Sequence, residues 1–337
     1  MKYNDKETLY RHLYRMMKRI RYFELGIETQ YKLNIVRGAA HLCLGEEAIA
    51  AGVCAVLEKD DYIATTHRGH GHLLAKGSDP RFMMAELLGR ETGYCKGKGG
   101  SMHISDYSVG VLCANGIVGG GIPIATGAGL AVKMKGMSNI VTCFFGDGAV
   151  CQGNFHEAVN MAAAWKLPVL FVCENNRYAI STRTRSVLAP EKISDLAGAY
   201  GIESMTVDGN DVLQVYDAAE KLKAGILNGE GPKFIEADTF RLAGHYIGDD
   251  ENYRDREATK KEWENEPIAR FERWMAAEYP LLAPELAEID TQEREAMNEA
   301  IAEAVTAPEP PVSIIYDDLF THSAAWERRS VSEKDYN

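Results

Sequence analysis

Two polar clusters stand at the ends of apolar runs in the middle of the chain. Gly146-Asp147-Gly148 follows the run from residue 140 to 145, and Asn175-Asn176 follows the run from 169 to 173. A segment of helical length lies between them, and a separation of about 30 residues is that of one βαβ unit. Parallel strands end at one edge of an open sheet, where such folds bind ligands. We therefore expect Asp147 and Asn176 to face a common site.

The residue types of this pair favour a hard cation that holds a phosphate. The carboxylate of Asp147 and the amide oxygen of Asn176 suit Mg²⁺, which shares an octahedral oxygen shell with phosphates. We expect Gly148 and Ala149 to open a helix, so that their backbone N–H groups meet phosphate oxygens. Gly-Asp-Gly by itself is more often a turn, but the asparagines at the next strand end favour a site. A nicotinamide site fits less well, because the G-x-G-x-x-G spacing is absent.

Strands and helices continue to alternate after this pair. Residues 204–207 and 233–237 predict two more strands, 208–210 a turn and cap, and 212–227 a helix. This order predicts an α/β fold with a mostly parallel sheet and helices on both faces. The polar segment 241–256 has no clear period, and a connection of that length is usually functional or mobile.

Helical segments flank this α/β region, and we expect one domain over residues 1–337. Apolar residues from Leu9 to Ile27 recur at steps of three and four, which predicts an amphipathic helix within an N-terminal extension of about 1–35. Its apolar face could pack on its own domain, which we favour, or on another subunit. Residues 45–57 predict a short helix, and Asp79-Pro80 begins another that stops at Gly89. From about 257 to 337 we expect an acidic helical tail.

Composition limits the classes of function. The 337 residues are 46% hydrophobic and carry a formal net charge of −12, which disfavours nucleic acid as a partner. No uninterrupted apolar stretch approaches about 18 residues and the N-terminus has no signal-peptide pattern, so we expect a cytoplasmic protein without a membrane span. The seven cysteines form no Cys-x-x-Cys pair and are interpreted as buried core residues in a reducing compartment.

The residues between the two polar clusters carry a family resemblance. From Gly146 to Asn176 the chain is similar to the thiamine diphosphate motif. The stretches 152–153, 155–158, 160–163 and 165–168 resemble the α subunit of the E1 component of 2-oxo acid and acetoin dehydrogenase complexes. This resemblance extends from Arg37-Gly38 to Tyr253-Arg254, about two thirds of the chain. It implies the thiamine diphosphate-binding fold, with thiamine diphosphate and Mg²⁺ as cofactors.

The resemblance assigns roles to individual residues. It implies that Asp147, Asn176 and the carbonyl group of Tyr178 ligate Mg²⁺, while Gly148 and Ala149 approach the diphosphate. The other implied site residues contact the cofactor or lie near it: Arg68 and the preceding His67 at the diphosphate, Gly116 and Val118 at the aminopyrimidine, and His245 and His103 as catalytic histidines.

Two positions depart from the family pattern. His67 stands where many members have tyrosine, and the charge of an imidazole there would depend on pH. Tyr246 stands where the animal pyruvate enzymes have a phosphorylated serine, which puts that regulation in doubt. A metal site formed by His67, His70 and His72 is disfavoured, because no carboxylate or cysteine accompanies them at zinc-ligand spacing. We expect His70 and His72 to be structural, or to lie near the diphosphate.

The implied reaction is cleavage of acetoin and transfer of the two-carbon unit to lipoamide on an E2 core. Residues 66–72, 75–77 and His245 with Gly248-Asp249 favour acetoin modestly over pyruvate, with branched-chain 2-oxo acids third. The family's activating glutamate belongs to a β subunit, which implies an α₂β₂ heterotetramer with composite sites. Two alternatives of another class are a Mg²⁺-dependent phosphohydrolase and a non-catalytic scaffold for a phosphate ligand.

Overall fold

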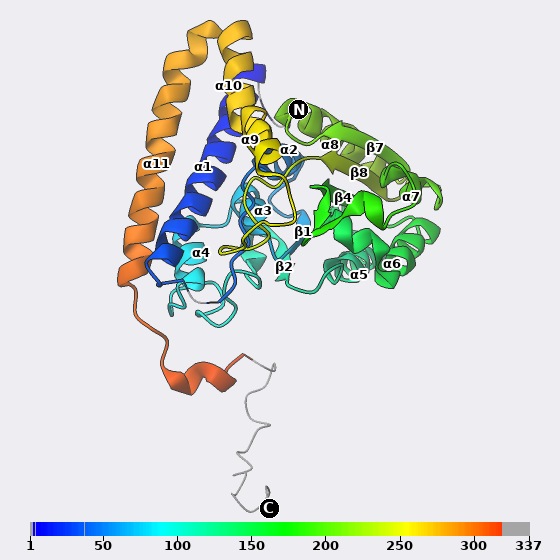
Figure 1. Ribbon diagram of the computed structural model, residues 1–337. Coiled ribbons are helices and arrows are strands. Elements are labelled where there is room, and N and C mark those ends of the chain that lie inside the picture. Colours follow the sequence, from blue (N-terminus) through cyan, green and yellow to red (C-terminus); the bar gives the residue numbers. More distant parts are fainter. Residues whose placement is uncertain (1–2, 4, 37, 319–337) are drawn as a thin grey trace, which may run out of the picture.

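A six-stranded parallel sheet forms the centre of the computed structural model, which describes residues 3, 5–36 and 38–318 (Figure 1). The strand order is β2-β1-β3-β4-β8-β7, and every neighbouring pair is parallel. The α/β prediction is therefore confirmed. The strand bounds are β1 Tyr62–Thr66, β2 Val111–Asn115, β3 Val141–Gly146, β4 Val169–Asn175, β7 Glu203–Asp208 and β8 Lys233–Asp238.

Strands β1 and β2 were not predicted from the sequence. Each has only five residues, and β2 lies within a glycine-rich segment, so neither shows a long apolar run. Burial of β1 comes from its place between β2 and β3. By contrast β3 and β4 are buried along nearly their whole length, which explains why their apolar runs were visible in the sequence.

Helices cover both faces of the sheet and enclose two hydrophobic clusters. One cluster joins the sheet to α1, α2, α3 and α8, and the other joins it to α5, α6 and α7. Successive side chains of β3 divide between them, since Phe144 belongs to the first and Phe145 to the second. The bounds are α2 Glu47–Val56, α3 His70–Lys76, α5 Gly121–Met134, α6 Gly153–Ala164, α7 Ser194–Gly198 and α8 Val212–Leu227.

The first and last long helices pack side by side. Helix α1 (Lys6–Lys32) lies along α11 (Ala283–Thr306), and α10 (Pro267–Glu278) packs near the start of both (Figure 1). The side chains of Leu13, Met17 and Ile20 are fully buried, so the apolar face of α1 packs within its own chain. Helices α4 (Pro80–Leu87) and α9 (Arg256–Glu264) complete the set. Of the regions expected from the sequence, the tail is described as far as residue 318, and Arg37 lies outside the described residues.

Two helix caps show where the sequence was read correctly and where it was not. The Asp79 carboxylate accepts from the backbone N–H of Arg81 at 2.9 Å, so α4 begins as predicted. Helix α8 is capped by Asp211 rather than by residues 208–210, because the Asp211 carboxylate accepts from the N–H groups of Leu213 and Gln214. No described helix combines the length and the apolar character that crossing a bilayer needs.

None of the cysteines forms a disulfide bond, and not all of them are buried. Cys43, Cys54, Cys143 and Cys173 lie in the interior, and Cys95 and Cys113 are half-buried. Cys151 is exposed, which corrects the prediction for that residue. It ends a short 3₁₀ turn, η2 (Asp147–Cys151), that leads from β3 toward α6, where the chain runs along the surface.

Candidate functional site

The two polar clusters meet at the carboxyl edge of the sheet. Strands β3 and β4 pair in parallel with Gly146 opposite Glu174, so Asp147 and Asn176 leave neighbouring strand ends. Both residues line a cavity of about 250 Å³. The predicted meeting of these residues is confirmed. Other predicted site residues line the same cavity: His67, Arg68, Val118, Gly148, Ala149, Tyr178 and His245.

Asp147 is a buried carboxylate that accepts a side-chain hydrogen bond from Thr184. Only 2% of the residue is exposed, and the hydroxyl group of Thr184 donates to Oδ2. Burial raises the pKa of Asp147 above its ordinary value, because desolvation disfavours the charged form. A divalent cation beside this carboxylate would reverse that effect, so the position fits a metal ligand. Thr184 was not anticipated from the sequence.

The side chain of Asn176 is held in one orientation. Its amide nitrogen donates to Oε1 of Glu46 at 2.8 Å, and its oxygen accepts from the backbone N–H of Tyr178 at 3.3 Å. Tyr178 begins a two-stranded hairpin of β5 (Tyr178–Ala179) and β6 (Thr182–Arg183) that closes over the cavity wall. The amide oxygen and the tyrosine backbone therefore lie on the same side of the site.

The glycine after Asp147 is required by a close approach. A Cβ atom on Gly148 would lie 2.7 Å from the Cβ of Ala179, so the hairpin could not pack as it does. Gly148 and Ala149 do not open the following α-helix, which corrects the sequence prediction. They form the 3₁₀ turn η2, and α6 begins only at Gly153. Any attraction for phosphate at this point therefore comes from local N–H groups rather than from the dipole of α6.

Two buried arginines line the cavity. Arg68 donates to the carbonyl groups of Leu42 at 2.5 Å and His245 at 3.1 Å. Arg241 donates to the Tyr253 hydroxyl at 2.8 Å and the Ile180 carbonyl at 3.1 Å, while its Nε has no partner among the described residues. Burial, with the nearby charge of Arg68, lowers the pKa of Arg241. Arg241 was missed because only its position at the start of the polar segment 241–256 distinguished it.

Glu46 is a further cavity residue that sequence reasoning missed. It is 2% exposed, and its Oε2 has no hydrogen-bond partner among the described residues although Nε of Arg68 lies 3.5 Å away. Burial raises the pKa of Glu46 to about 7. The unpartnered atoms of Glu46 and Arg241, together with buried Asp147, indicate a cavity built for a charged ligand. These residues fit a diphosphate held by a divalent cation.

Three histidines gather beside the arginines. The ring of His41 packs edge-on against His67 and His245, with ring centres 4.6 and 5.0 Å apart, and the rings of His67 and His245 lie 5.5 Å apart. Burial, with the charge of Arg68 as the next cause, lowers the pKa of His67 to about 2. The expected dependence of its charge on ordinary pH is therefore wrong, because an imidazole with that pKa stays neutral.

His70 and His72 have structural roles, in agreement with the first of the two expectations. His70 lies 2.9 Å from both the Glu24 carboxylate and the Ser101 hydroxyl. His72 lies 2.8 Å from the Thr65 hydroxyl and 3.0 Å from the Glu174 carboxylate. Both rings are buried and hydrogen-bonded at each nitrogen, and among the described residues His67 groups with His41 and His245 rather than with His70 and His72.

The remaining predicted residues lie at the rim. Val118 is 50% exposed and lines the cavity. A Cβ atom on Gly116 would lie 3.3 Å from the His103 ring, so these two residues are neighbours. His103 is exposed and is not among the described residues that line the cavity.

Comparisons with known proteins agree with this geometry. The model of the family described as "Dehydrogenase E1 component" matches residues 15–313. The α subunit of acetoin:2,6-dichlorophenolindophenol oxidoreductase is 44% identical in Bacillus subtilis, over 91% of this chain and 92% of the relative. The protein of the same name from Cupriavidus necator is 41% identical over 94% and 95%. The α subunit of the pyruvate dehydrogenase E1 component of Rhizobium meliloti is 38% identical over 91% and 88%.

Proposed function

The chain belongs to the dehydrogenase E1 component family, and from this premise we propose that it is the α subunit of a thiamine diphosphate-dependent enzyme that cleaves acetoin. The observation that carries the proposal is the pairing of Asp147 and Asn176 at neighbouring strand ends, in a cavity lined by buried charged residues. Such a cavity suits a dication and a diphosphate. The resemblance read from the sequence and the family match then identify the cofactor class.

The residues that line the cavity would hold the cofactor and its cation. Asp147, Asn176 and the carbonyl group of Tyr178 would hold Mg²⁺, and the N–H groups of Gly148 and Ala149 would meet the diphosphate. Arg68 and Arg241 offset phosphate charge at short range, whereas the distant net charge of −12 is screened beyond about 8 Å. When bound, thiamine diphosphate supplies a carbon nucleophile and an electron sink.

The histidines are placed to move protons. Burial lowers the pKa of His245 to about 4, so its ring is neutral near pH 7 and one nitrogen can accept a proton. The Arg241 guanidinium can only donate, so its 3.4 Å contact makes Nδ1 the accepting nitrogen and leaves the proton on Nε2; Nδ1 takes up a proton only when this contact opens. We assign His245 as a catalytic residue. His103 is kept as a second candidate that depends on the assembled enzyme.

The substrate assignment follows the relatives' names. Acetoin is named for the Bacillus subtilis and Cupriavidus necator relatives and pyruvate for that of Rhizobium meliloti. We place acetoin first, pyruvate second and branched-chain 2-oxo acids third. Reduction of dichlorophenolindophenol by the reconstituted enzyme, measured with acetoin and with pyruvate, tests this order. A higher kcat/KM for pyruvate would reverse it.

We propose that the active unit is an α₂β₂ heterotetramer in the cytoplasm. A β subunit would complete the site with the carboxylate that activates the pyrimidine ring, and a lipoyl-bearing E2 would receive the two-carbon unit. This arrangement predicts that the chain without its β partner has no acetoin-dependent dye reduction. Turnover by the isolated chain would contradict the composite site.

Cofactor binding gives the decisive test of the assignment. Calorimetry on the chain with its β partner should show thiamine diphosphate binding that requires Mg²⁺. Asp147→Asn should abolish the Mg²⁺-dependent binding of thiamine diphosphate, because it removes the only carboxylate assigned to the cation. Asp195→Asn, a matched change of an exposed carboxylate, should bind as the parent does. Absence of binding by the parent, or release of inorganic phosphate from phosphate esters, would favour a phosphohydrolase instead.

A further inference from the structure

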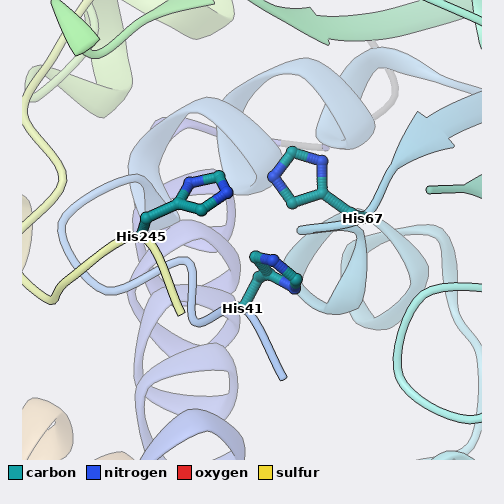
Figure 2. A group of neighbouring side chains, drawn as sticks. All are labelled: His41, His67 and His245. Atoms are coloured by element: carbon teal, nitrogen blue, oxygen red, sulfur yellow. The ribbon is translucent and has the colours of Figure 1, made fainter. Parts of the chain in front are cut away.

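Three imidazole rings from distant parts of the chain converge beside the cavity. His41 precedes α2, His67 follows the last residue of β1, and His245 belongs to the polar segment after β8. Figure 2 shows the rings of His67 and His245 on either side of His41. One ring nitrogen from each residue lies within 4.8 Å of the other two. Three imidazole nitrogens at this spacing can share one cation.

One of these donors lacks any partner in the fold. His41 is 92% buried, and its Nδ1 has no hydrogen bond to a described residue. A buried polar atom without a partner costs free energy, so it indicates a group that binds something from outside the chain. The His41 ring packs against the rings of His67 and His245, so its unpartnered Nδ1 belongs to the cluster.

All three rings are neutral at physiological pH, which metal coordination requires. Burial lowers the pKa of His41 to about 3, that of His67 to about 2 and that of His245 to about 4, with the charge of Arg68 as the second cause in each case. Imidazole nitrogen favours zinc, copper and nickel over Mg²⁺, which prefers oxygen. The chemistry of this cluster therefore differs from that of the oxygen donors at Asp147 and Asn176.

We propose that His41, His67 and His245 form a binding site for a borderline transition-metal cation such as Zn²⁺, separate from the Mg²⁺ site. Three protein nitrogens leave a fourth tetrahedral position open toward water or a ligand in the cavity. Nitrogen ligands at about 2.0–2.1 Å from zinc lie roughly 3.3 Å from one another, so modest ring rotations suffice to close the observed spacing. Binding does not rest on the proposed function. A further expectation, that bound metal inhibits the enzyme because it immobilises His245, does rest on the proposed function.

Two nearby arginines lower the affinity of the site for a metal ion. Arg68 and Arg241 repel a dication, although the Glu46 carboxylate near Arg68 offsets part of that charge. The Arg241 contact to Nδ1 of His245, at 3.4 Å, is longer than its contacts to Ile180 and Tyr253. Arg241 can therefore release the ring and keep its shorter bonds. We expect a roughly micromolar Kd rather than the tighter binding of a structural zinc site.

The test is a metal titration of the full chain without an affinity tag. The chain should compete with a chromophoric chelator for Zn²⁺, with one site per chain, and Co²⁺ in place of Zn²⁺ should give the strong visible absorption of a tetrahedral complex. His67→Phe and His41→Asn should each weaken Zn²⁺ binding by at least roughly tenfold, which is 1.4 kcal/mol. His156→Asn, which changes a histidine hydrogen-bonded to Tyr200 outside the cluster, should keep the affinity of the parent.

Three outcomes would overturn the proposal. They are absence of zinc binding by the parent, unchanged affinity in both cluster variants, or loss of affinity in Asp147→Asn, which would place the zinc at the oxygen donors. Circular dichroism of each variant shows that it is folded, and using two variants keeps the test valid if one of them is not. Failure of thiamine diphosphate binding would contradict the proposed function but leave the zinc result unaffected, so the two proposals fail separately.

Discussion

At the scale of single residues, the carboxylate at the centre of the site depends on a neighbour far away in the sequence. Asp147 is buried, and Thr184 donates to it from the turn η3 (Thr184–Ser186). This hydrogen bond lowers the pKa of Asp147 and so opposes the larger effect of burial, which raises that pKa. Thr184 thus helps to keep the carboxylate ionised and oriented, which a cation ligand needs.

Removing this hydroxyl should weaken both the fold and the cation site. We expect Thr184→Val to lower the free energy of unfolding by about 1–2 kcal/mol, because the buried carboxylate keeps its desolvation without its donor. The affinity for Mg²⁺ in the presence of thiamine diphosphate should fall as well. Urea unfolding and calorimetry measure the two effects. Thr182→Val, which changes an exposed threonine of β6, serves as the control. Equal free energies of unfolding and equal Mg²⁺ affinities in the two variants would show that the Thr184 hydrogen bond has no such role.

The neutral histidines predict how stability changes with pH. The pKa of His67 is about 2 in the fold, against an ordinary value of 6.5, so the unfolded chain binds more protons between these values. The free energy of unfolding should therefore fall as pH is lowered below about 6.5, and each such histidine contributes at most about 1.4 kcal/mol per pH unit. Glu46, whose pKa is raised to about 7, acts in the opposite direction between 4.5 and 7.

Comparison with a variant isolates the histidine contribution. In the presence of a chelator, His67→Phe should show a shallower loss of stability between pH 6.5 and 4.5 than the parent, since the Glu46 contribution is common to both proteins. Urea unfolding at several pH values measures the slopes. Parallel slopes would mean that the pKa of His67 is not lowered by the fold.

At the scale of elements, a single carboxylate organises the glycine-rich segment beside the site. Glu86 of α4 is fully buried and accepts four backbone N–H groups, from Cys95 at 2.7 Å, Gly97 at 2.9 Å, Gly99 at 2.7 Å and Gly100 at 3.1 Å. Gly97 and Gly100 have φ of +72° and +63°, in the left-handed region that favours glycine. The loop takes its shape from this carboxylate rather than from regular secondary structure.

Loss of Glu86 should therefore release the loop. We expect Glu86→Ala to destabilise the chain by about 3 kcal/mol, because four partly buried N–H groups lose their acceptor. Hydrogen exchange should accelerate at residues 95–100 and much less at the strands. Glu91→Ala removes an exposed carboxylate a few residues away and should leave exchange unchanged. Unaltered exchange in Glu86→Ala would contradict the role assigned to this residue.

At the scale of the whole molecule, the first and last long helices, α1 and α11, pack against each other. Arg15 and Arg19 of α1 reach the Glu293 carboxylate of α11 at 2.9 and 2.8 Å. The Glu293 side chain is 3% exposed, whereas the two arginines are about one third exposed. The carboxylate, not the arginines, is therefore the group that cannot be left unpaired.

This asymmetry predicts the result of a mutant cycle. Arg15→Met with Arg19→Met should destabilise the chain by roughly 2–3 kcal/mol, because Glu293 stays buried without a counter-ion. Adding Glu293→Met to that double variant should restore most of the loss, since it replaces the buried charge with an apolar side chain. Thermal unfolding of the three proteins measures the cycle. A triple variant less stable than the double variant would show that the carboxylate has some other buried partner.

The sequence determined the features that are local or periodic. The apolar runs of β3 and β4 are visible because both strands are buried on both faces, and the polar residues that follow them mark the carboxyl edge of a parallel sheet. The meeting of Asp147 and Asn176 in one cavity could be predicted for that reason. The apolar stripe of α1 and the start of α4 follow from helical period and from capping chemistry, which act over a few residues.

Only the tertiary structure decided which distant side chains complete the site. Glu46 and Arg241 line the cavity and Thr184 donates to Asp147; the three come from separate segments, and nothing near them in the sequence marks them as part of the site. The cluster of His41, His67 and His245 likewise exists only because the segments before α2, after β1 and after β8 converge in the folded chain. Their neutral state has the same origin: burial and the field of Arg68 are set by three-dimensional packing, so no residue pattern along the chain records them.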